Sequence, residues 1–303
     1  NILDINNYIP VMQFIDTCRE IRTEVCVNIG KIKDAKGMDF YDNVVLSELH
    51  EIETNGICVD SLKFYEYFKI KSSAMQYSKY NIFTKTGRPS NINSVVNFSA
   101  LNKSSGVRSI IVSRFEKGKL IEFDYESHHF RLMGKLLNYT FPSGNIHEYF
   151  GKIYFSVDQL TEEQYEESKQ ISFRQLYGES EMEVSELDFF RKIQKYKEKL
   201  WEIYNANEYL ETPIAKRRIY KRHHRKMNLH KLFNYLLQAY ETEHNILVIK
   251  RVNDFLKNKN TKLILYTYDS FLFDFDLRDG KEVLNDLKNI IEDERMPSNV
   301  KAG

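Results

Sequence analysis

The pattern of apolar positions near the end of the chain predicts a β-hairpin. Residues 262–276, KLILYTYDSFLFDFD, hold two apolar runs rich in strand-forming residues around a polar centre, Tyr268-Asp269-Ser270. Two such runs joined by so short a centre favour a pair of strands and a tight turn that carries Asp269. A second apolar run, residues 119–123, is followed directly by another carboxylate, Asp124. Adjacent strand ends could therefore bring two aspartates together, and paired carboxylates are ligands that Mg²⁺ accepts alongside substrate phosphates.

Helical periodicity marks most of the other segments. Residues 1–78 are expected to be mainly helical, with Asp60 or Ser61 as the cap of one helix. The remaining expected elements are, in chain order, a strand over residues 107–115, a strand over 119–124, a helix from about Ser127, a long helix or a broken pair over 228–257, a helix over 281–293 and the beginning of a last strand in the tail.

One predicted helix, residues 161–178, has an unusual face. Thr161 and Gln164 form a capping box at its start, and Gly178 is a suitable stop. Four residues recur at every fourth position and so share this face: Tyr165, Lys169, Phe173 and Tyr177. A cation among aromatic rings suits a phosphate and a stacked base. The alternative is a face that simply packs against the protein core.

Composition narrows the function classes. The 303 residues include 42% hydrophobic residues and carry a net charge of +1, so any nucleic-acid site has to be a local patch. Residues 216–226, KRRIYKRHHRK, form one dense basic segment that could contact a phosphate backbone or could simply be solvated. Cys18, Cys26 and Cys58 lack metal-site spacing and are expected to be reduced thiols. No apolar run reaches the roughly 20 residues of a membrane span and no secretory signal opens the chain, so a cytoplasmic location is expected.

Several polar residues are individually weak candidates for a binding site. His128 and His129 are neighbours on a helix and should point in different directions, which makes them poor ligands for one metal ion. His147 near a helix start could approach a phosphate or could be an ordinary surface histidine. Arg88, in a loop bounded by Gly and Pro, could reach a phosphate or a base edge. Two amides four residues apart, Asn234 and Gln238, could face base edges in a minor groove.

Taken in order, these segments resemble the motifs of family A, polymerase I-like, DNA polymerases over roughly residues 45–303. The segments that carry the resemblance are residues 86–90 (TGRPS), Asp124-Tyr125 with Arg131 (motif A), residues 145–147 (NIH), Lys169, Phe173, Tyr177 and Gly178 (motif B), residues 209–218 with Arg217 and Arg218, the pair Asn234 and Gln238, and Tyr268-Asp269-Ser270 (motif C). The spacing within motif B is fully kept.

The resemblance implies an α+β fold, a right-hand polymerase palm with an antiparallel sheet and inserted helical fingers. Its divisions would be an N-terminal helical segment at 1–78, a first palm part at 79–140, fingers at 141–215 and a second palm part at 216–303. Only about 25 residues separate Asp60 from Thr86, where the family has a long helical thumb. The thumb is therefore expected to be reduced or missing, and a phage-type origin would suit so small and divergent a chain.

The implied activity is template-directed DNA synthesis from dNTPs on a primer-template, with two Mg²⁺ ions for which Mn²⁺ can substitute. The implied catalytic residues are Asp124, Asp269 and Lys169, and the implied metal ligands are Asp124, Asp269 and the carbonyl of Tyr125. The implied dNTP contacts are His147, Lys169, Phe173, Tyr177, His129 and Arg131. The implied DNA contacts are Arg88, Asn97, Gly178, Arg217, Arg218, Asn234, Gln238 and Tyr268. No exonuclease motif is evident, so a separate exonuclease, thumb-like or processivity protein could be a partner.

The sequence also departs from the family pattern. Tyr165 replaces an Arg of motif B, His129 replaces the motif A Glu that excludes ribose, and Tyr268 and Ser270 replace the outer residues of motif C. We expect an active enzyme with altered sugar discrimination or fidelity, and Phe173 implies poor use of dideoxynucleotides. Two alternatives stay open, a single-subunit RNA polymerase and a non-catalytic nucleic-acid-binding subunit of a replication assembly.

Overall fold

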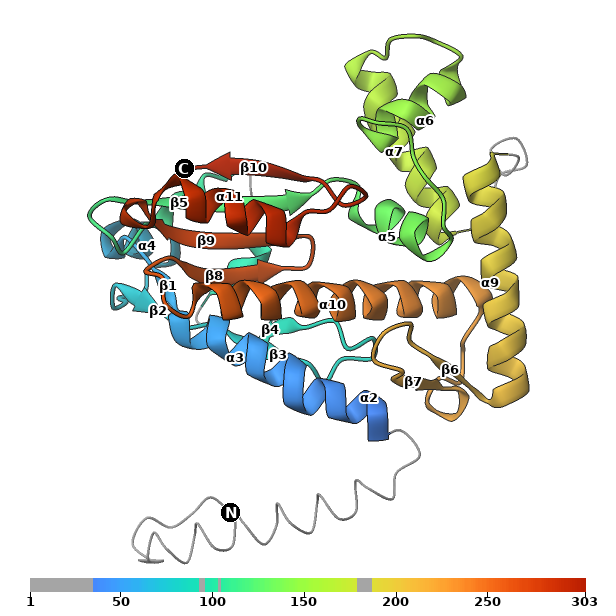
Figure 1. Cartoon of the computed structure of the whole chain (residues 1–303), viewed down its shortest axis with the longest axis horizontal. Helices are drawn as coiled ribbons and strands as arrows, with labels where there is room; N and C mark the ends of the chain where they lie inside the picture. Colours follow the sequence, from blue (N-terminus) through green and yellow to red (C-terminus); the bar gives the residue numbers. More distant parts are fainter. Residues whose placement is uncertain (1–34, 93–95, 103–104, 179–186) are drawn as a thin grey trace, which may run out of the picture.

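The computed structural model describes residues 35–92, 96–102, 105–178 and 187–303 (Figure 1). The helices expected before residue 35, together with Cys18 and Cys26, lie outside these residues, as do residues 179–186. Cys58 is half-buried, and burial raises the pKa of its thiol. No helix within the described ranges combines the length and the apolarity that a bilayer crossing requires.

A four-stranded antiparallel sheet with the strand order β10-β5-β9-β8 forms the centre of one end of the molecule (Figure 1). Its strands are β5 (Gly118–Tyr125), β8 (Lys262–Thr267), β9 (Ser270–Asp276) and β10 (Ser298–Ala302). The expected hairpin is confirmed, because β8 and β9 pair across Tyr268 and Asp269. The tail is confirmed as a last strand. The register places Asp124 opposite Ser270 of β9 and opposite Asn299 of β10.

Alternation along β5 assigns the two faces of the sheet. Ile121, Phe123 and Tyr125 are buried on one face, in a core shared with α3 (Leu46–Asn55), α10 (Leu229–Leu256) and α11 (Gly280–Ile291). Since successive strand residues point to opposite faces, Leu120, Glu122 and Asp124 lie on the other face. Asp124 therefore projects from the face of the sheet opposite to the one that packs against α3, α10 and α11.

That second face is covered at one end by residues 57–68 and 96–111, which form their own small core with Leu265 and Ile264. The strand expected over residues 107–115 is wrong. Val107–Ile110 is a 3₁₀ turn, and the following residues wrap around the fully buried Asp274 of β9. Asp274 accepts hydrogen bonds from Ser113 Oγ (2.6 Å) and from Arg114 Nε (2.7 Å), whose guanidinium also reaches the end of α3. This polar anchor outweighs the strand propensity of an apolar run.

The other end of the molecule is helical. Its core joins α5 (His128–Leu136), α6 (Ile146–Phe155), α7 (Glu162–Tyr177) and α9 (Asp188–Asn207) to the first half of α10. In Figure 1, α10 runs from the sheet to α9, and α6 and α7 stand away from the sheet beyond α5. The segment at 228–257 is thus one continuous helix rather than a broken pair, and the capping box of Thr161 and Gln164 is confirmed.

Short elements complete the described chain. The helical ones are α2 (Ala35–Phe40), a π-helical turn (Tyr41–Val45), α4 (Ser61–Phe68) and 3₁₀ turns at Phe98–Ala100, Lys221–His223 and Leu277–Asp279. Two-stranded pairs are β1 (Ile57–Cys58) with β2 (Met75–Gln76), β3 (Lys79–Asn81) with β4 (Ser90–Ile92), and β6 (Tyr209–Glu211) with β7 (Arg218–Tyr220). The region before residue 79 is therefore helical only in part, because it contains β1 and β2.

Candidate active site

An open cavity of about 570 Å³ lies where the sheet meets the helical end. Its walls contain residues from β5, the β8–β9 turn, α5, α7 and α10. The cavity gathers these residues of the predicted site: Asp124, Tyr125, Asp269, His129, His147, Lys169, Phe173, Tyr177, Arg88 and Gln238. Segments more than 100 residues apart in sequence thus contribute to one space, as an active site built between separate elements requires.

The acidic wall is fixed by the backbone of the sheet. The amide of Asp269 donates to the carbonyl of Thr267 (2.8 Å), which closes a three-residue turn around Tyr268. Tyr268 has a φ of 65°, an uncommon value for an aromatic residue, so the backbone is strained next to the carboxylate. The amide of Tyr125 donates to the carbonyl of Asp269 (2.8 Å) and ties the turn to β5. Both aspartates are therefore held at one sheet end.

The charge of Asp124 affects the protonation of Asp269. Although Asp269 is exposed as a whole residue, partial burial of its carboxylate and then the charge of Asp124 raise its pKa. Asp124 has a cationic neighbour, since Lys301 Nζ lies 3.4 Å from its Oδ2. A paired carboxylate site with a nearby backbone carbonyl supplies the hard oxygen donors that Mg²⁺ prefers. Within the described ranges, no group of three or more Asp, Glu, His or Cys side chains is arranged to hold a metal ion.

The opposite wall is the expected face of α7. Lys169 Nζ forms an ion pair with Glu166 (2.7 Å) and lies 4.4 Å from the centre of the Tyr165 ring. The rings of Phe173 and Tyr177 are stacked with centroids 6.0 Å apart. Phe173 is 40% exposed, which is high for so large an apolar side chain. This wall thus offers one cation and one accessible aromatic surface to the cavity.

His147 lies in this wall and not on the surface, so the surface alternative is wrong for it. Its side chain packs against Phe130 and Phe173, with ring centroids 5.2 Å away in each case. Burial, followed by the charge of Lys169, lowers its pKa to about 4. His147 is therefore neutral near pH 7. Its Nδ1 atom is buried and has no hydrogen-bond partner among the described residues, which leaves it available to a ligand.

A buried carboxylate that the sequence analysis missed, Glu241 of α10, joins the two walls. Its side chain is 2% exposed, and its oxygens lie 2.9 Å from Arg88 Nε, 3.0 Å from His129 Nε2 and 3.5 Å from His128 Nδ1. Burial alone would raise the pKa of Glu241, but hydrogen bonds from the two histidines hold it well below its usual range. His129 Nδ1 in turn hydrogen-bonds the hydroxyl of Tyr177 on α7.

This network corrects one expectation. His128 and His129 were expected to point apart, but both approach the same oxygen of Glu241 because α10 passes across the first turn of α5. The signal for Glu241 was present in the sequence. It follows Gln238 by three residues and Asn234 by seven, so the three polar residues share one face of the helix.

Arg88 lines the cavity near the turn and contacts Tyr268. The guanidinium carbon of Arg88 lies 3.7 Å from the centre of the Tyr268 ring, while the same side chain pairs with Glu241. Asn245 Nδ2 donates to the carbonyl of Tyr268 and holds the strained turn from below. The positions that resemble two separate family motifs are therefore in direct contact.

The remaining predicted residues lie outside the cavity lining. Arg131 is buried and donates to the carbonyls of Glu126 and Gly144, so it braces the loop before α6. Arg217 donates to the carbonyls of Thr84 and Lys85. Arg218 pairs with Glu211 (3.1 Å). Much of the basic segment is thus engaged within the protein itself.

Three further predicted positions complete the picture. Asn97 is exposed next to a 3₁₀ turn on the second face of the sheet. Gly178 ends α7, where the buried Lys197 donates to its carbonyl (3.0 Å). Asn234 lies one turn before Gln238 on α10, and its Oδ1 atom is buried without a hydrogen-bond partner among the described residues.

Comparison with known proteins places this geometry in a fold. No protein-family profile matches the sequence, and no curated protein matches it either. Among solved structures, it is similar to the POL domain of Pol1 from M. smegmatis, determined in complex with a DNA primer-template and dNTP. The TM-score is 0.64 at 18% sequence identity, over 77% of this chain and 48% of that one. The chain thus spans about half the length of this structural relative, and its mixed α+β fold with antiparallel sheets is similar to the fold of that POL domain.

Proposed function

We propose that this chain is a template-directed DNA polymerase that adds deoxynucleotides to the 3′-hydroxyl of a primer. The observation that carries the proposal is the cavity itself. It places two aspartates from adjacent strands opposite a lysine and stacked aromatics from one helix face, in a chain with the fold of a polymerase domain. An acidic wall facing a cationic one suits a nucleoside triphosphate whose phosphates bind cations on one side and Lys169 on the other.

In this proposal the acidic wall holds the metal. Asp124 and Asp269, with the carbonyl of Tyr125, would bind two Mg²⁺ ions, or Mn²⁺ in their place. Such a pair stabilises the attacking and the leaving oxygens of a phosphoryl transfer. Burial, and then repulsion from the charge of Asp124, raises the pKa of Asp269, and a bound cation would relieve that repulsion.

The α7 wall binds the nucleotide. Lys169 carries the charge that contacts the triphosphate and can give a proton to the leaving pyrophosphate. His147 is neutral near pH 7, so its role is to hydrogen-bond a phosphate oxygen and not to neutralise charge. Phe173 packs on the sugar, and Tyr177 lies beneath the new base pair. Closure of α7 over a matched pair would couple recognition to chemistry.

The DNA contacts follow from the cavity edge. Arg88 and Gln238 of the cavity lining, with Tyr268 against Arg88, would surround the last primer base pair. Asn234 would extend that row along α10, since its Oδ1 has no hydrogen-bond partner among the described residues. Arg217 supports this row indirectly, because it holds the loop that presents Arg88. Arg131 would contribute by positioning neighbouring backbone, because it donates to the carbonyls of Glu126 and Gly144. The further DNA contacts in this proposal are Arg218, Asn97 and Gly178.

The grip on the duplex is expected to be weak. Between Asp60 and Thr86 the chain forms only α4 and the short strands β2 and β3. We infer that this region replaces a long thumb, so that the enzyme makes short products unless another protein supplies the grip. Counting nucleotides added per binding event, with excess unlabelled DNA as a trap, tests this part separately.

The activity is tested by primer extension with dNTPs and Mg²⁺. We expect extension by the wild type and its loss in Asp124→Ala and Asp269→Ala. A matched control is Asp286→Ala, which removes an exposed carboxylate from α11, far from the cavity lining. Circular dichroism and primer-template binding confirm that each variant is folded.

The outcomes separate the alternatives. Extension only with rNTPs would favour an RNA polymerase. A folded wild type that binds primer-template but forms no product with either nucleotide set would favour a non-catalytic subunit. Extension that survives both aspartate substitutions would remove the proposed metal site.

A further inference from the structure

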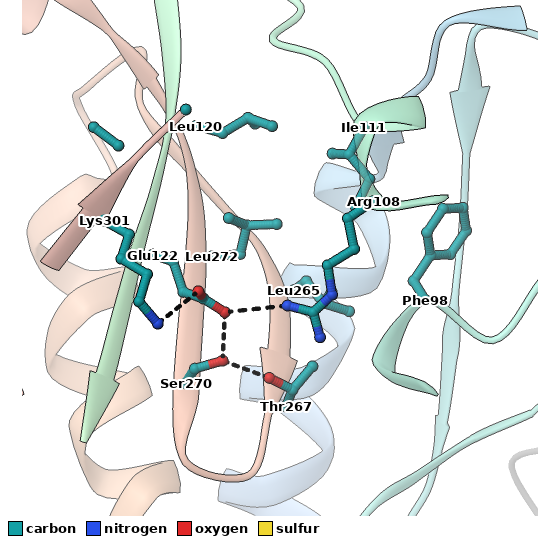
Figure 2. A pocket seen from close by; sticks show the side chains of 12 residues that line it. Phe98, Arg108, Ile111, Leu120, Glu122, Leu265, Thr267, Ser270, Leu272 and Lys301 are labelled. Carbon is teal, nitrogen blue, oxygen red and sulfur yellow. Dashed lines mark hydrogen bonds and ion pairs between the residues drawn. The ribbon is translucent and has the colours of Figure 1, made fainter. Parts of the chain in front are cut away.

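A second, smaller cavity of about 230 Å³ lies on the same face of the sheet as Asp124 (Figure 2). Apolar side chains such as Phe98, Leu265 and Leu272 line its interior. Its polar edge is a cluster of charged and hydroxyl side chains: Glu122, Lys301, Arg108, Ser270 and Thr267. Nothing in the proposed chemistry uses this cluster, although it begins two residues from a candidate metal ligand.

The strand register explains why Lys301 serves two carboxylates. On β10, Lys301 lies directly opposite Glu122 of β5, and Asp124 is its diagonal neighbour on the same face. Lys301 Nζ lies 3.9 Å from Glu122 Oε2 and 3.4 Å from Asp124 Oδ2. One ammonium group is therefore shared between a carboxylate that would bind metal and a carboxylate that would not.

Glu122 is held in place independently of Lys301. Ser270 Oγ donates to its Oε1 (3.3 Å), and Arg108 Nη1 lies 3.8 Å from the same oxygen. Ser270 is itself hydrogen-bonded to Thr267 Oγ1 (2.5 Å), so the cluster spans β5, β8 and β9 (Figure 2). Glu122 is thus a fixed anionic position, whereas the long Lys301 side chain is 58% exposed.

We propose that Glu122 and Lys301 form an exchange pair that controls access of divalent cations to Asp124. In the metal-free protein Lys301 neutralises Asp124, and when a cation binds there Lys301 moves fully onto Glu122. Glu122 is in this sense a positioning residue that acts through Lys301. This inference rests on the proposed metal site at Asp124 and Asp269.

The physical argument is competition for one carboxylate. An ammonium group and a divalent cation cannot both approach Asp124 closely, because like charges a few ångströms apart repel. Exposed ion pairs are weak, so Lys301 is displaceable. A second carboxylate within reach lowers the cost of displacing it, and Glu122 lies directly across the strand pair. Without Glu122, Lys301 would stay on Asp124 and compete more strongly.

The test measures binding of Mn²⁺ alone, by the electron paramagnetic resonance signal of the free ion, on full-length protein without DNA or nucleotide. Only binding that Asp124→Ala abolishes is counted. We expect Lys301→Met to tighten this binding about two- to fivefold, the range expected from an exposed ion pair. We expect Glu122→Gln, which keeps an acceptor for Ser270, to weaken it by a similar factor. Lys119→Met, which removes a cation from the far end of β5, is the charge control and should leave it unchanged.

The double variant Glu122→Gln/Lys301→Met decides the mechanism. If Glu122 acts through Lys301, the loss caused by Glu122→Gln disappears in the Lys301→Met background. An equal loss in both backgrounds means that Glu122 acts only as a nearby negative charge and overturns the proposal, as does Lys301→Met with wild-type affinity. Wild-type protein whose Mn²⁺ binding ignores Asp124 would instead overturn the proposed metal site itself, so the two failures are distinguishable.

Discussion

The two walls of the large cavity differ in charge and in how they are held. Main-chain hydrogen bonds fix the acidic wall, since the turn at Tyr268 and Asp269 is tied to β5 by the amide of Tyr125. On the α7 wall, side chains set the geometry, and Lys169 is positioned by an ion pair with Glu166 on its own helix. The acidic wall is therefore preorganised by the backbone, while the α7 wall can change its geometry.

The anchoring of α7 supports this contrast. At its C-terminal end Tyr177 bonds His129, and the buried Lys197 donates to the carbonyl of Gly178. Lys169 lies two turns earlier on α7, a helix that stands away from the sheet (Figure 1). This earlier part of α7 packs on α6, where Ser168 Oγ donates to the carbonyl of His147 (2.9 Å). A helix pair held to the rest of the protein mainly at one end suits a wall that closes on a substrate. The comparison predicts that changes on the α7 wall affect catalysis more than folding. Changes at the joint between the walls, which is Glu241 with Arg88, His128 and His129, should affect both.

The largest effect is expected for Lys169→Ala. Removing one preorganised charge that contacts a developing anion lowers a catalytic rate by about 100-fold or more. We expect this loss in the single-nucleotide incorporation rate, with primer-template affinity nearly unchanged. Rapid-quench measurements at saturating dNTP check it.

The matched control for Lys169 is Lys152→Ala. Lys152 is similarly exposed and pairs with Glu148 at 2.8 Å on α6, outside the cavity lining. Its incorporation rate should stay within about twofold of wild type. Equal losses in the two variants would show that the α7 wall has no special role.

Glu241→Ala tests the joint between the walls. The substitution removes the acceptor shared by Arg88, His128 and His129, and breaking such a buried pair costs about 3 kcal/mol of unfolding free energy. Urea unfolding followed by circular dichroism measures the change. Glu202→Ala, which removes an exposed carboxylate from α9, should change the unfolding free energy by less than about 0.5 kcal/mol. A stable Glu241→Ala protein would mean that the two walls are held together elsewhere.

The sequence predicted the acidic wall well because strand alternation and a short turn specify it locally. The hairpin and the carboxylate after residues 119–123 needed no long-range information beyond pairing of the two strands. The face of α7 could also be predicted from the sequence, because a repeat of four residues aligns Tyr165, Lys169, Phe173 and Tyr177 on a helix.

The joint was not predictable in the same way. Glu241 becomes significant only because α10 crosses α5 and the loop of Arg88, and no local pattern encodes that crossing. The failed strand at 107–115 has the same origin, because the fully buried Asp274 of a distant strand captures Ser113 and Arg114. Buried charges require partners, which can come from distant segments, and local propensity does not indicate them.

His147 gives the α7 wall a pH dependence. Its pKa is lowered to about 4 in the folded protein from a usual 6.5, so the unfolded chain binds more protons between these values. Above pH 6.5 this histidine does not lower the unfolding free energy. As the pH falls from 6.5 towards 4, the unfolded chain takes up the proton first and the unfolding free energy decreases. Between pH 8 and pH 5 the loss amounts to about 2 kcal/mol.

Comparing wild type with His147→Gln isolates this contribution, because other buried histidines also titrate. The variant should lose less unfolding free energy on acidification, whereas His50→Gln, at an exposed position on α3, should follow the wild type. Parallel pH profiles of wild type and His147→Gln would show that His147 is not held neutral in the folded protein.

Tyr177→Phe is expected to have the smallest effect. It is the most direct test of the link between the α7 wall and the joint. Its hydroxyl hydrogen-bonds His129, which in turn pairs with Glu241, so the substitution disconnects α7 from the joint without removing a ring. The unfolding free energy should fall by about 1 kcal/mol. Tyr154→Phe is the matched variant, because Tyr154 also uses its hydroxyl in one side-chain hydrogen bond, to Ser172 at 3.0 Å, but lies outside the cavity lining.

The two tyrosine variants should therefore lose similar stability and differ in nucleotide selection. If the link through His129 positions the surface that the sugar meets, only Tyr177→Phe changes the ratio of dNTP to rNTP incorporation, by about fivefold. Single-nucleotide incorporation with matched dNTP and rNTP measures this ratio. If both variants shift it equally, the hydroxyl acts through general stability. If neither does, sugar selection depends on the ring of Tyr177 or on Phe173, and the joint serves only to hold the two walls together.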